Sequence, residues 1–164
     1  MATSIKPTTN PGEVLSIIPV VDDAIDWAAS FPDLADEEMK RKRYSEDHDM
    51  SVLVFVQGSK PTIFQFAHPA RADISTEVRK LYTRFGSGSG NAPDLFREVF
   101  NLAYQGKREG LDGEREPAPK HNGEIVTQYF QGIEDAGIFQ ELSLAFIEAY
   151  RRSMRKDGLT DSKK

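Results

Sequence analysis

Apolar side chains recur at helical spacing through the second half of the chain. Four segments carry an apolar stripe at steps of three and four residues, which is typical of helices that bury one face. The predicted helices cover residues 73–85, 93–105, 122–136 and 138–156, and Gly86, Gly106 and Gly137 follow the first three. Asp73 or Ser75 is the expected cap of the first, and Asn122 that of the third. This pattern restricts the chain to a mainly helical fold.

Two further helices are predicted near the N-terminus. Residues 20–31 combine an apolar stripe with aspartates in the early turns, and Pro32 ends the pattern. Asp33 can cap a second helix over residues 34–45, whose acidic first half and basic second half give favourable pairs four residues apart. We expect this second helix to be mostly exposed.

One segment favours strand instead of helix. Residues 51–57 contain five consecutive apolar residues, so both faces of this strand should be covered. A turn over residues 58–61 and a second strand over 62–67 would complete an antiparallel hairpin. The predicted fold class is therefore α+β and mainly helical, with a short antiparallel β-hairpin packed by about five to six helices.

The length of 164 residues indicates a single domain. Residues 1–12 are polar and predict a flexible arm, or an arm that orders on a partner. The domain itself should cover residues 13–156. Its expected parts are an N-terminal helical segment (13–50), the hairpin with its helices (51–105), a loop or short helix within 106–121, and a C-terminal helix pair (122–156). Residues 157–164 predict a flexible tail.

Composition excludes several classes of function. The net charge of −5 disfavours a protein that coats nucleic acid. The chain has no cysteine, so disulfides, thiolate catalysis and cysteine-ligated metals are excluded. Its longest apolar runs, residues 14–21 and 52–56, are far shorter than the roughly 20 residues that span a bilayer. Residues 1–10 lack the apolar core of a secretory signal, and we expect no membrane association.

Several clusters invite a chemical interpretation, and each has a simpler one. The run Glu46-Asp47-His48-Asp49 offers metal ligands, but its consecutive side chains point in different directions. His68 and His121 lie at element ends, and Ser51, Ser59 and Ser75 lie in no nucleophile-elbow pattern. We therefore predict no catalytic residue, no metal site and no cofactor.

Glycine-rich and basic segments also have simpler interpretations than ligand binding. Residues 86–91 follow a helix and contain no lysine, so they predict a linker instead of a phosphate loop. Three basic groups lie at residues 40–43, at Arg79, Lys80 and Arg84, and at residues 151–156. Acidic neighbours or a helix dipole account for the first and third, so nucleic acid is not an expected partner.

The predicted helices and strands carry more phenylalanine than one small core should hide. A surplus of buried-type side chains would form an exposed patch for another protein. The candidate partner-binding residues are Phe55, Phe64, Phe66, Phe96, Phe100, Phe130, Phe139 and Phe146.

The order of predicted elements resembles that of a known family. A hairpin (52–56 and 62–66) leads into an amphipathic helix (74–85), a Leu- and Phe-rich helix (95–104), a charged loop and paired C-terminal helices. This layout resembles the tail assembly chaperones of long-tailed bacteriophages across residues 50–155. The resemblance implies a non-enzymatic assembly factor that binds tail proteins, acting in the host cytoplasm or incorporated in a virion. The alternative is a minor structural subunit of the head, neck or tail of a virus particle, and either protein would be a homo- or hetero-oligomer.

Overall fold

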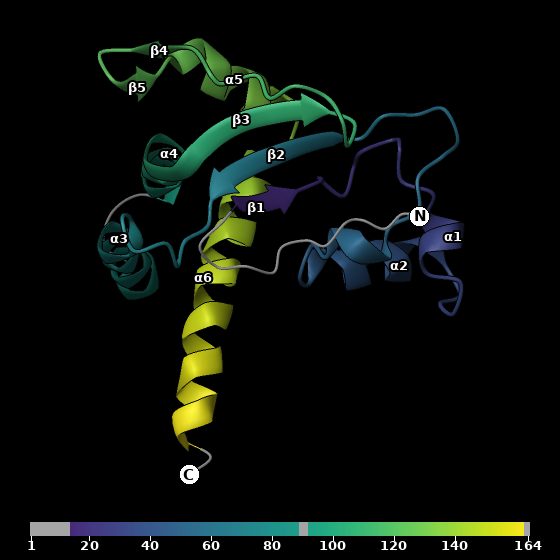
Figure 1. Cartoon of the computed structure of the whole chain (residues 1–164), viewed down its shortest axis with the longest axis horizontal. Coiled ribbons are helices and arrows are strands. Elements are labelled where there is room, and N and C mark those ends of the chain that lie inside the picture. Colours follow the sequence, from purple (N-terminus) through teal and green to yellow (C-terminus); the bar gives the residue numbers. More distant parts are fainter. Residues whose placement is uncertain (1–13, 89–91, 163–164) are drawn as a thin grey trace.

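A small antiparallel sheet with helices around it forms the centre of the protein (Figure 1). The computed structural model describes residues 14–88 and 92–162, with side chains as far as residue 154. Six α-helices and a three-stranded sheet make this part of the chain a mainly helical α+β fold. The predicted fold class is confirmed, although only one strand of the predicted hairpin, residues 62–67, belongs to the sheet.

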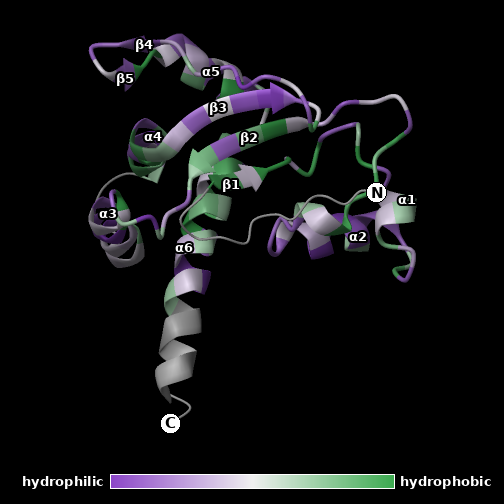
Figure 2. Ribbon diagram, in the orientation of Figure 1, coloured by the Kyte–Doolittle hydropathy of each residue, from purple (hydrophilic) through white to green (hydrophobic). Residues whose placement is uncertain are grey.

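The sheet joins three segments that lie far apart in the sequence. Its order is β1 (Val14–Ile17), β2 (Thr62–Ala67), β3 (Tyr104–Glu109), with β2 in the centre. Leu15 of β1 lies opposite Phe66, and the register of β2 with β3 shifts between Gln65 and Phe66. Figure 2 shows that β3 is largely hydrophilic and that β1 and β2 carry more of the apolar residues. Of the three strands, only residues 62–67 were predicted.

The main hydrophobic core lies between this sheet and four helices. These are α3 (Ser75–Ser87), α4 (Ala92–Ala103), α5 (Thr127–Asp135) and α6 (Phe139–Ser162). Phe66 and Phe100 are fully buried at its centre, with ring centroids 5.1 Å apart in an edge-to-face contact. Each such ring removes roughly 150–250 Å² from water, so this cluster is the largest source of stability.

A second, smaller core lies under the N-terminal segments. It is formed by Ile18, Ile25, Trp27, Tyr44, Leu53 and Ile63. The surrounding elements are short: α1 (Trp27–Ser30), α2 (Glu37–Ser45) and the 3-10 helix η1 (Met50–Val52). In Figure 1, α1 and α2 lie on the opposite side of α6 from α3 and α4.

The predicted strand over residues 51–57 is wrong, and so is the hairpin that it began. Asp49 caps η1, and Phe55 then makes a single β-bridge with Ile25. Val54 and Val56 are 44% and 45% exposed, so the apolar run is not covered on both sides. Because β1 and β3 occupy both edges of β2, residues 51–57 cannot pair with it.

The predicted helix over residues 20–31 is also wrong for most of its length. Only Trp27–Ser30 is helical. Asp22 holds a turn instead, because its carboxylate accepts the backbone N–H groups of Ala24 at 2.8 Å and Thr62 at 2.9 Å. The acids that suggested a helix start therefore stabilise a turn and, in the case of Asp26, cap α1.

The second N-terminal helix is confirmed with a later start. It begins at Glu37 with Asp36 as its cap, in place of Asp33. Most of its residues are exposed, as predicted, and only Lys40 and Tyr44 are buried, on its inner face. The Lys40 ammonium donates to the Phe31 carbonyl oxygen at 2.8 Å and also to that of Leu34, so the buried charge closes the turn before α2.

The segment expected to be a loop or short helix contains strands. β3 follows α4 directly, and Lys120–His121 (β4) pairs with Glu124–Ile125 (β5). Asn122 and Gly123 form the turn of this hairpin with φ values of 54° and 82°. Asn122 is therefore a hairpin residue and not a helix cap, and α5 begins five residues later.

The four predicted C-terminal helices are all present, although α5 begins five residues late and α6 ends six residues late. Neither Asp73 nor Ser75 caps α3: its N-cap residue is Ile74, and the left-handed Gly88 follows its end. The backbone of α6 stays helical to Ser162, beyond the predicted start of the flexible tail. The predicted arm over residues 1–12 lies outside the described residues.

Candidate functional site

An open groove of about 720 Å³ follows the outer face of α6. One wall is the loop over residues 45–48, at the end of α2. The other is the C-terminal half of α3, with Tyr82, Phe85 and Gly86. The floor is α6 itself from Glu141 to Arg152. The groove thus lies where the small N-terminal core meets the main core.

Apolar side chains line the middle of the groove. Leu144 on the floor is 36% exposed, and Ile147 on the floor and Phe85 on the α3 wall are partly buried. Two ring contacts hold the α3 wall: Tyr82 lies 5.3 Å from Tyr150, and Phe85 lies 6.1 Å from Phe96, centroid to centroid. The wall is therefore anchored to both α6 and α4.

Charged side chains form the rim of the groove. Glu148 pairs with Arg151 at 2.8 Å and with Arg152 at 3.7 Å along α6. Arg152 also donates to the backbone oxygen of Asp47 at 3.5 Å, which joins the loop wall to the floor. The side chains of Glu46 and Asp47 are exposed, and no ion pair with another described residue involves them.

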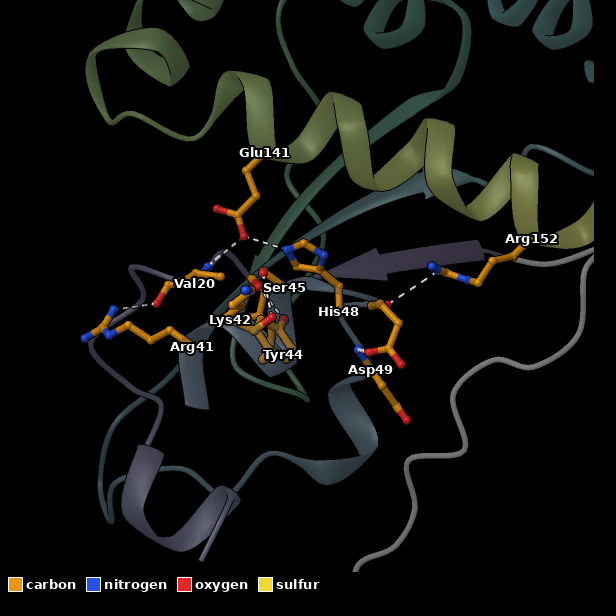
Figure 3. Close-up of polar contacts among 11 residues, drawn as sticks. Val20, Arg41, Lys42, Tyr44, Ser45, His48, Asp49, Glu141 and Arg152 are labelled. Atoms are coloured by element: carbon orange, nitrogen blue, oxygen red, sulfur yellow. Dashed lines mark hydrogen bonds and ion pairs between the residues drawn. The ribbon is translucent and has the colours of Figure 1, made fainter. Parts of the chain in front are cut away.

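His48 and Glu141 meet at one end of the groove (Figure 3). The Nε2 atom of His48 lies 2.6 Å from Oε2 of Glu141, and the side chains are only 9% and 19% exposed. The same Oε2 accepts the backbone N–H of Val20 at 2.8 Å. One carboxylate of α6 therefore holds both the loop wall and the chain that leaves β1.

Local backbone geometry places His48 in this position. Its φ of 49° is left-handed, a conformation in which histidine is tolerated, and its N–H donates to the Tyr44 carbonyl at 2.8 Å. The Tyr44 ring lies against the imidazole, with centroids 5.0 Å apart. The turn that ends α2 thereby directs the imidazole at α6.

Tyr44 supports the pair from inside the small core. Its hydroxyl donates to the carbonyl oxygen of Ile18. Burial raises the pKa of the Tyr44 phenol well above its usual range, and the charge of Glu141 adds to this. The phenol therefore remains a neutral hydrogen-bond donor at physiological pH.

The predicted phenylalanine residues lie mainly inside the molecule. Seven of the eight are at most 8% exposed: Phe64, Phe66, Phe96, Phe100, Phe130, Phe139 and Phe146. Phe55 is partly buried against the small core. The expected surplus of aromatic surface is therefore not found in the single chain, because the two cores together bury these rings. Among the α6 residues whose side chains are described, the large apolar ones that are exposed are Leu144 and Met154, which the prediction did not include.

The other candidates from the sequence stay apart. His68 is half-buried at the end of β2, where its Nδ1 accepts the N–H of Ala70 at 3.0 Å. Burial lowers the pKa of His68, and the nearby charge of Arg152 lowers it further. His121 is exposed in β4, and the part of the chain with described side chains holds no cluster of three potential metal ligands.

Two predicted basic groups are largely engaged with partners. Lys40 is buried against carbonyl oxygens, and Arg41 pairs with Glu37 and donates to the Val20 carbonyl at 3.1 Å. On α3, Lys80 lies 3.4 Å from Glu77, and Arg84 lies 3.0 Å from Glu98. The predicted linker begins with the last turn of α3 and Gly88, and its residues 89–91 lie outside the described part.

Sequence reasoning missed Glu141 and Tyr44 as members of this site. Glu141 is 93 residues from His48, and no spacing pattern connects them. The single available signal was Tyr44, an aromatic residue on a helix that is otherwise strongly charged.

Comparison with known proteins gives no relative from which a function could be transferred. None of the helices within the described residues is both long and apolar enough to cross a membrane. No family model, no curated protein and no solved structure matches this chain.

Proposed function

We propose that this protein is a non-enzymatic assembly factor that binds other proteins by taking a helix into the groove on α6. The observation that carries the proposal is the outer face of α6, which presents apolar side chains inside a charged rim. Leu144, Ile147, Arg151 and Met154 follow one another at steps of three or four residues. This spacing is that of a helix seam, and grooves of this kind bind the apolar face of an amphipathic helix.

Because the phenylalanine residues are buried, we place the proposed protein-binding interface on the outer face of α6 instead. A protein-binding patch was expected on the Phe-rich faces, which form the core instead. The exposed large hydrophobic side chains of the described residues are aliphatic, and two of them lie on α6: Leu144 at 36% and Met154 at 39%. These residues replace the phenylalanines as the proposed contacts with a partner.

A role in the assembly of a phage tail remains our specific proposal for the setting, in the host cytoplasm or in a particle. It now rests on the succession β2, α3, α4, a charged segment, α5 and α6. The hairpin that opened the resemblance is not present, so the similarity of layout starts at β2. A minor structural subunit of the particle is the alternative, and detection of the protein in purified particles would favour it.

One observation favours a second candidate, an enzyme that uses His48 as a general base. The imidazole has a carboxylate partner, as a general base often does, and it lines the groove. However, Oε2 of Glu141 also accepts the Val20 N–H, and the nearby Ser45 hydroxyl donates to the Lys42 carbonyl. These contacts support a structural role for the pair, which fixes a wall of the groove.

Site-specific photo-crosslinking in the native host tests the proposal. We would place a benzophenone amino acid at Ile147 in the groove and, as the matched control, at the exposed Leu111 after β3. The expected result is a discrete crosslink at Ile147 to a helical segment, identified by mass spectrometry, and none at Leu111. Equal or no crosslinking at the two positions would contradict the proposal. His48→Gln removes the proposed general base. If the crosslink at Ile147 is still formed in this variant, the groove binds its partner without that base, which disfavours the enzyme.

A further inference from the structure

We infer that the helix which occupies this groove is α6 of a second copy, packed antiparallel about a two-fold axis. This inference rests on the proposed function, because it names the partner of the same groove. It would make the working form of the protein a homodimer whose interface is isologous, so that each copy offers the same surface.

The position of Met154 argues for a second α6 over a short peptide. Leu144 lines the groove, but Met154 lies beyond the last lining residue and is still 39% exposed. The two residues are ten positions apart, or about 15 Å along a helix. A short segment seated in the groove would leave Met154 in water. An antiparallel α6 can place its own Met154 against Leu144 and its Leu144 against Met154.

This register also gives the centre of the interface a consistent chemistry. When Leu144 faces Met154 of the second copy, Ile147 faces its Arg151. The methylene stem of an arginine can cover an apolar neighbour while its guanidinium reaches the rim. Glu148 lies on that rim in each copy and already binds Arg151 within its own helix.

Charge complementarity sets the direction of the second helix. The groove wall exposes Glu46 and Asp47, and α6 carries Arg151 and Arg152 after its apolar residues. An antiparallel partner brings its basic end towards the acidic wall and opposes the two helix dipoles. A parallel partner would place the two basic ends together. The complementarity therefore favours the antiparallel arrangement.

The contact between His48 and Glu141 gives the groove a fixed shape before a partner arrives. It holds the loop wall against α6, and the bond of Arg152 to the backbone of the neighbouring Asp47 adds a second tie to this helix. A preformed site loses less conformational entropy on binding. The single chain therefore offers a ready surface to its copy.

Sedimentation velocity over a wide range of concentration tests the inference with full-length protein. Wild type should show a reversible species of twice the 18.4 kDa chain mass. Leu144→Glu and Met154→Glu should each weaken the dimer at least about tenfold, because each introduces a charge at an apolar contact. Leu111→Glu, at a residue that is 50% exposed, is the control and should leave the dimer intact.

The outcomes separate this inference from the proposed function. A wild type that is monomeric at every concentration overturns the inference, whether the groove is covered by residues 1–13 of its own chain or by nothing. A dimer that Leu144→Glu weakens and Met154→Glu does not would also overturn it, because the partner would then end within the groove. In either case, a groove crosslink from Ile147 to a different protein would still support the proposed function. Circular dichroism of each variant establishes that it is folded.

Discussion

The two hydrophobic cores are stabilised in different ways. The main core is enclosed by regular elements, and the fully buried rings of Phe100 and Phe146 both pack on that of Phe66. The small core is enclosed by short helices and irregular chain. Its segments are tied by side chains that bond backbone groups, such as Tyr44 to Ile18 and Asp22 to Thr62. The small core should therefore depend on single polar contacts, whereas the main core should depend on packed volume.

The groove lies at the boundary between these two regions, and Glu141 belongs to both. It is on α6 of the main core, yet both of its partners, Val20 and His48, flank the small core. Glu141 thus holds the loop wall against α6 through polar contacts, although its side chain is a member of neither hydrophobic core. The comparison predicts which substitutions act on the whole fold and which act on one region.

The largest effect should come from Phe100→Ala. Phe100 is fully buried and its ring contacts those of Phe66, Tyr104, Phe130 and Phe139. Its loss should lower the free energy of unfolding by about 3–5 kcal/mol. Denaturant unfolding followed by circular dichroism measures this. A loss below that of Tyr44→Phe would contradict the ranking of the two cores.

Tyr44→Phe should have a smaller and more local effect. It keeps the ring but leaves the buried Ile18 carbonyl without the hydroxyl, at a cost of about 1–3 kcal/mol. Trp27, the only tryptophan, lies 5.7 Å from Tyr44, so its fluorescence reports on the small core. In the variant, the fluorescence transition should precede the circular dichroism transition. Coincident transitions would show that the two cores unfold as one unit.

Glu141→Ala should loosen the boundary by about 1–3 kcal/mol, because Val20 and His48 both lose their acceptor. Hydrogen exchange should increase at Val20 and in the loop over residues 45–48. The matched control is Glu148→Ala, one of the exposed ion pairs on the same helix, with an expected loss of about 0–1 kcal/mol. An equal loss of unfolding free energy in the two variants would mean that the contacts of Glu141 with Val20 and His48 stabilise the fold no more than an exposed ion pair does.

The smallest expected effect is on the pH dependence of stability, and it comes from His68 at the end of β2. The pKa of His68 is lowered in the folded state by burial and then by Arg152, so the unfolded chain binds a proton more readily. This contribution to stability is present above the ordinary histidine pKa of about 6.5 and is lost as pH falls below it. His68→Asn should therefore make the free energy of unfolding less dependent on pH between about 7 and 5. An unchanged dependence would rule out this contribution.

The sequence predicted correctly those helices that bury a single apolar face. The stripes of α3 to α6 each pack on the main core, so their periodicity reports the burial directly. The acids of residues 22–26 misled because carboxylates hold turns as readily as helix starts, and only the contact of Asp22 with Thr62 distinguishes the two. The apolar residues 52–56 misled because strand pairing depends on neighbours that lie far away in sequence.

The hairpin of β4 and β5 could have been predicted, since Asn122-Gly123 is a typical two-residue turn. The groove could not. Its walls come from residues 45–48 and from α3, and its floor comes from a helix about 60 to 100 residues later in the chain. Nor could the sequence show that Leu144 and Met154 line an exposed face of α6, because their exposure depends on which elements pack beside that helix.

Cysteine crosslinking tests the paired groove most directly, because the chain has no cysteine of its own. Leu144→Cys and Met154→Cys would be made singly and together, and oxidised at low concentration. We expect a disulfide-linked dimer when the two single variants are mixed, and also in the double variant. Neither single variant alone should crosslink, because an antiparallel pair keeps identical positions apart. Efficient crosslinking of Leu144→Cys to itself, or no crosslink in the mixture, would contradict the antiparallel α6 pair.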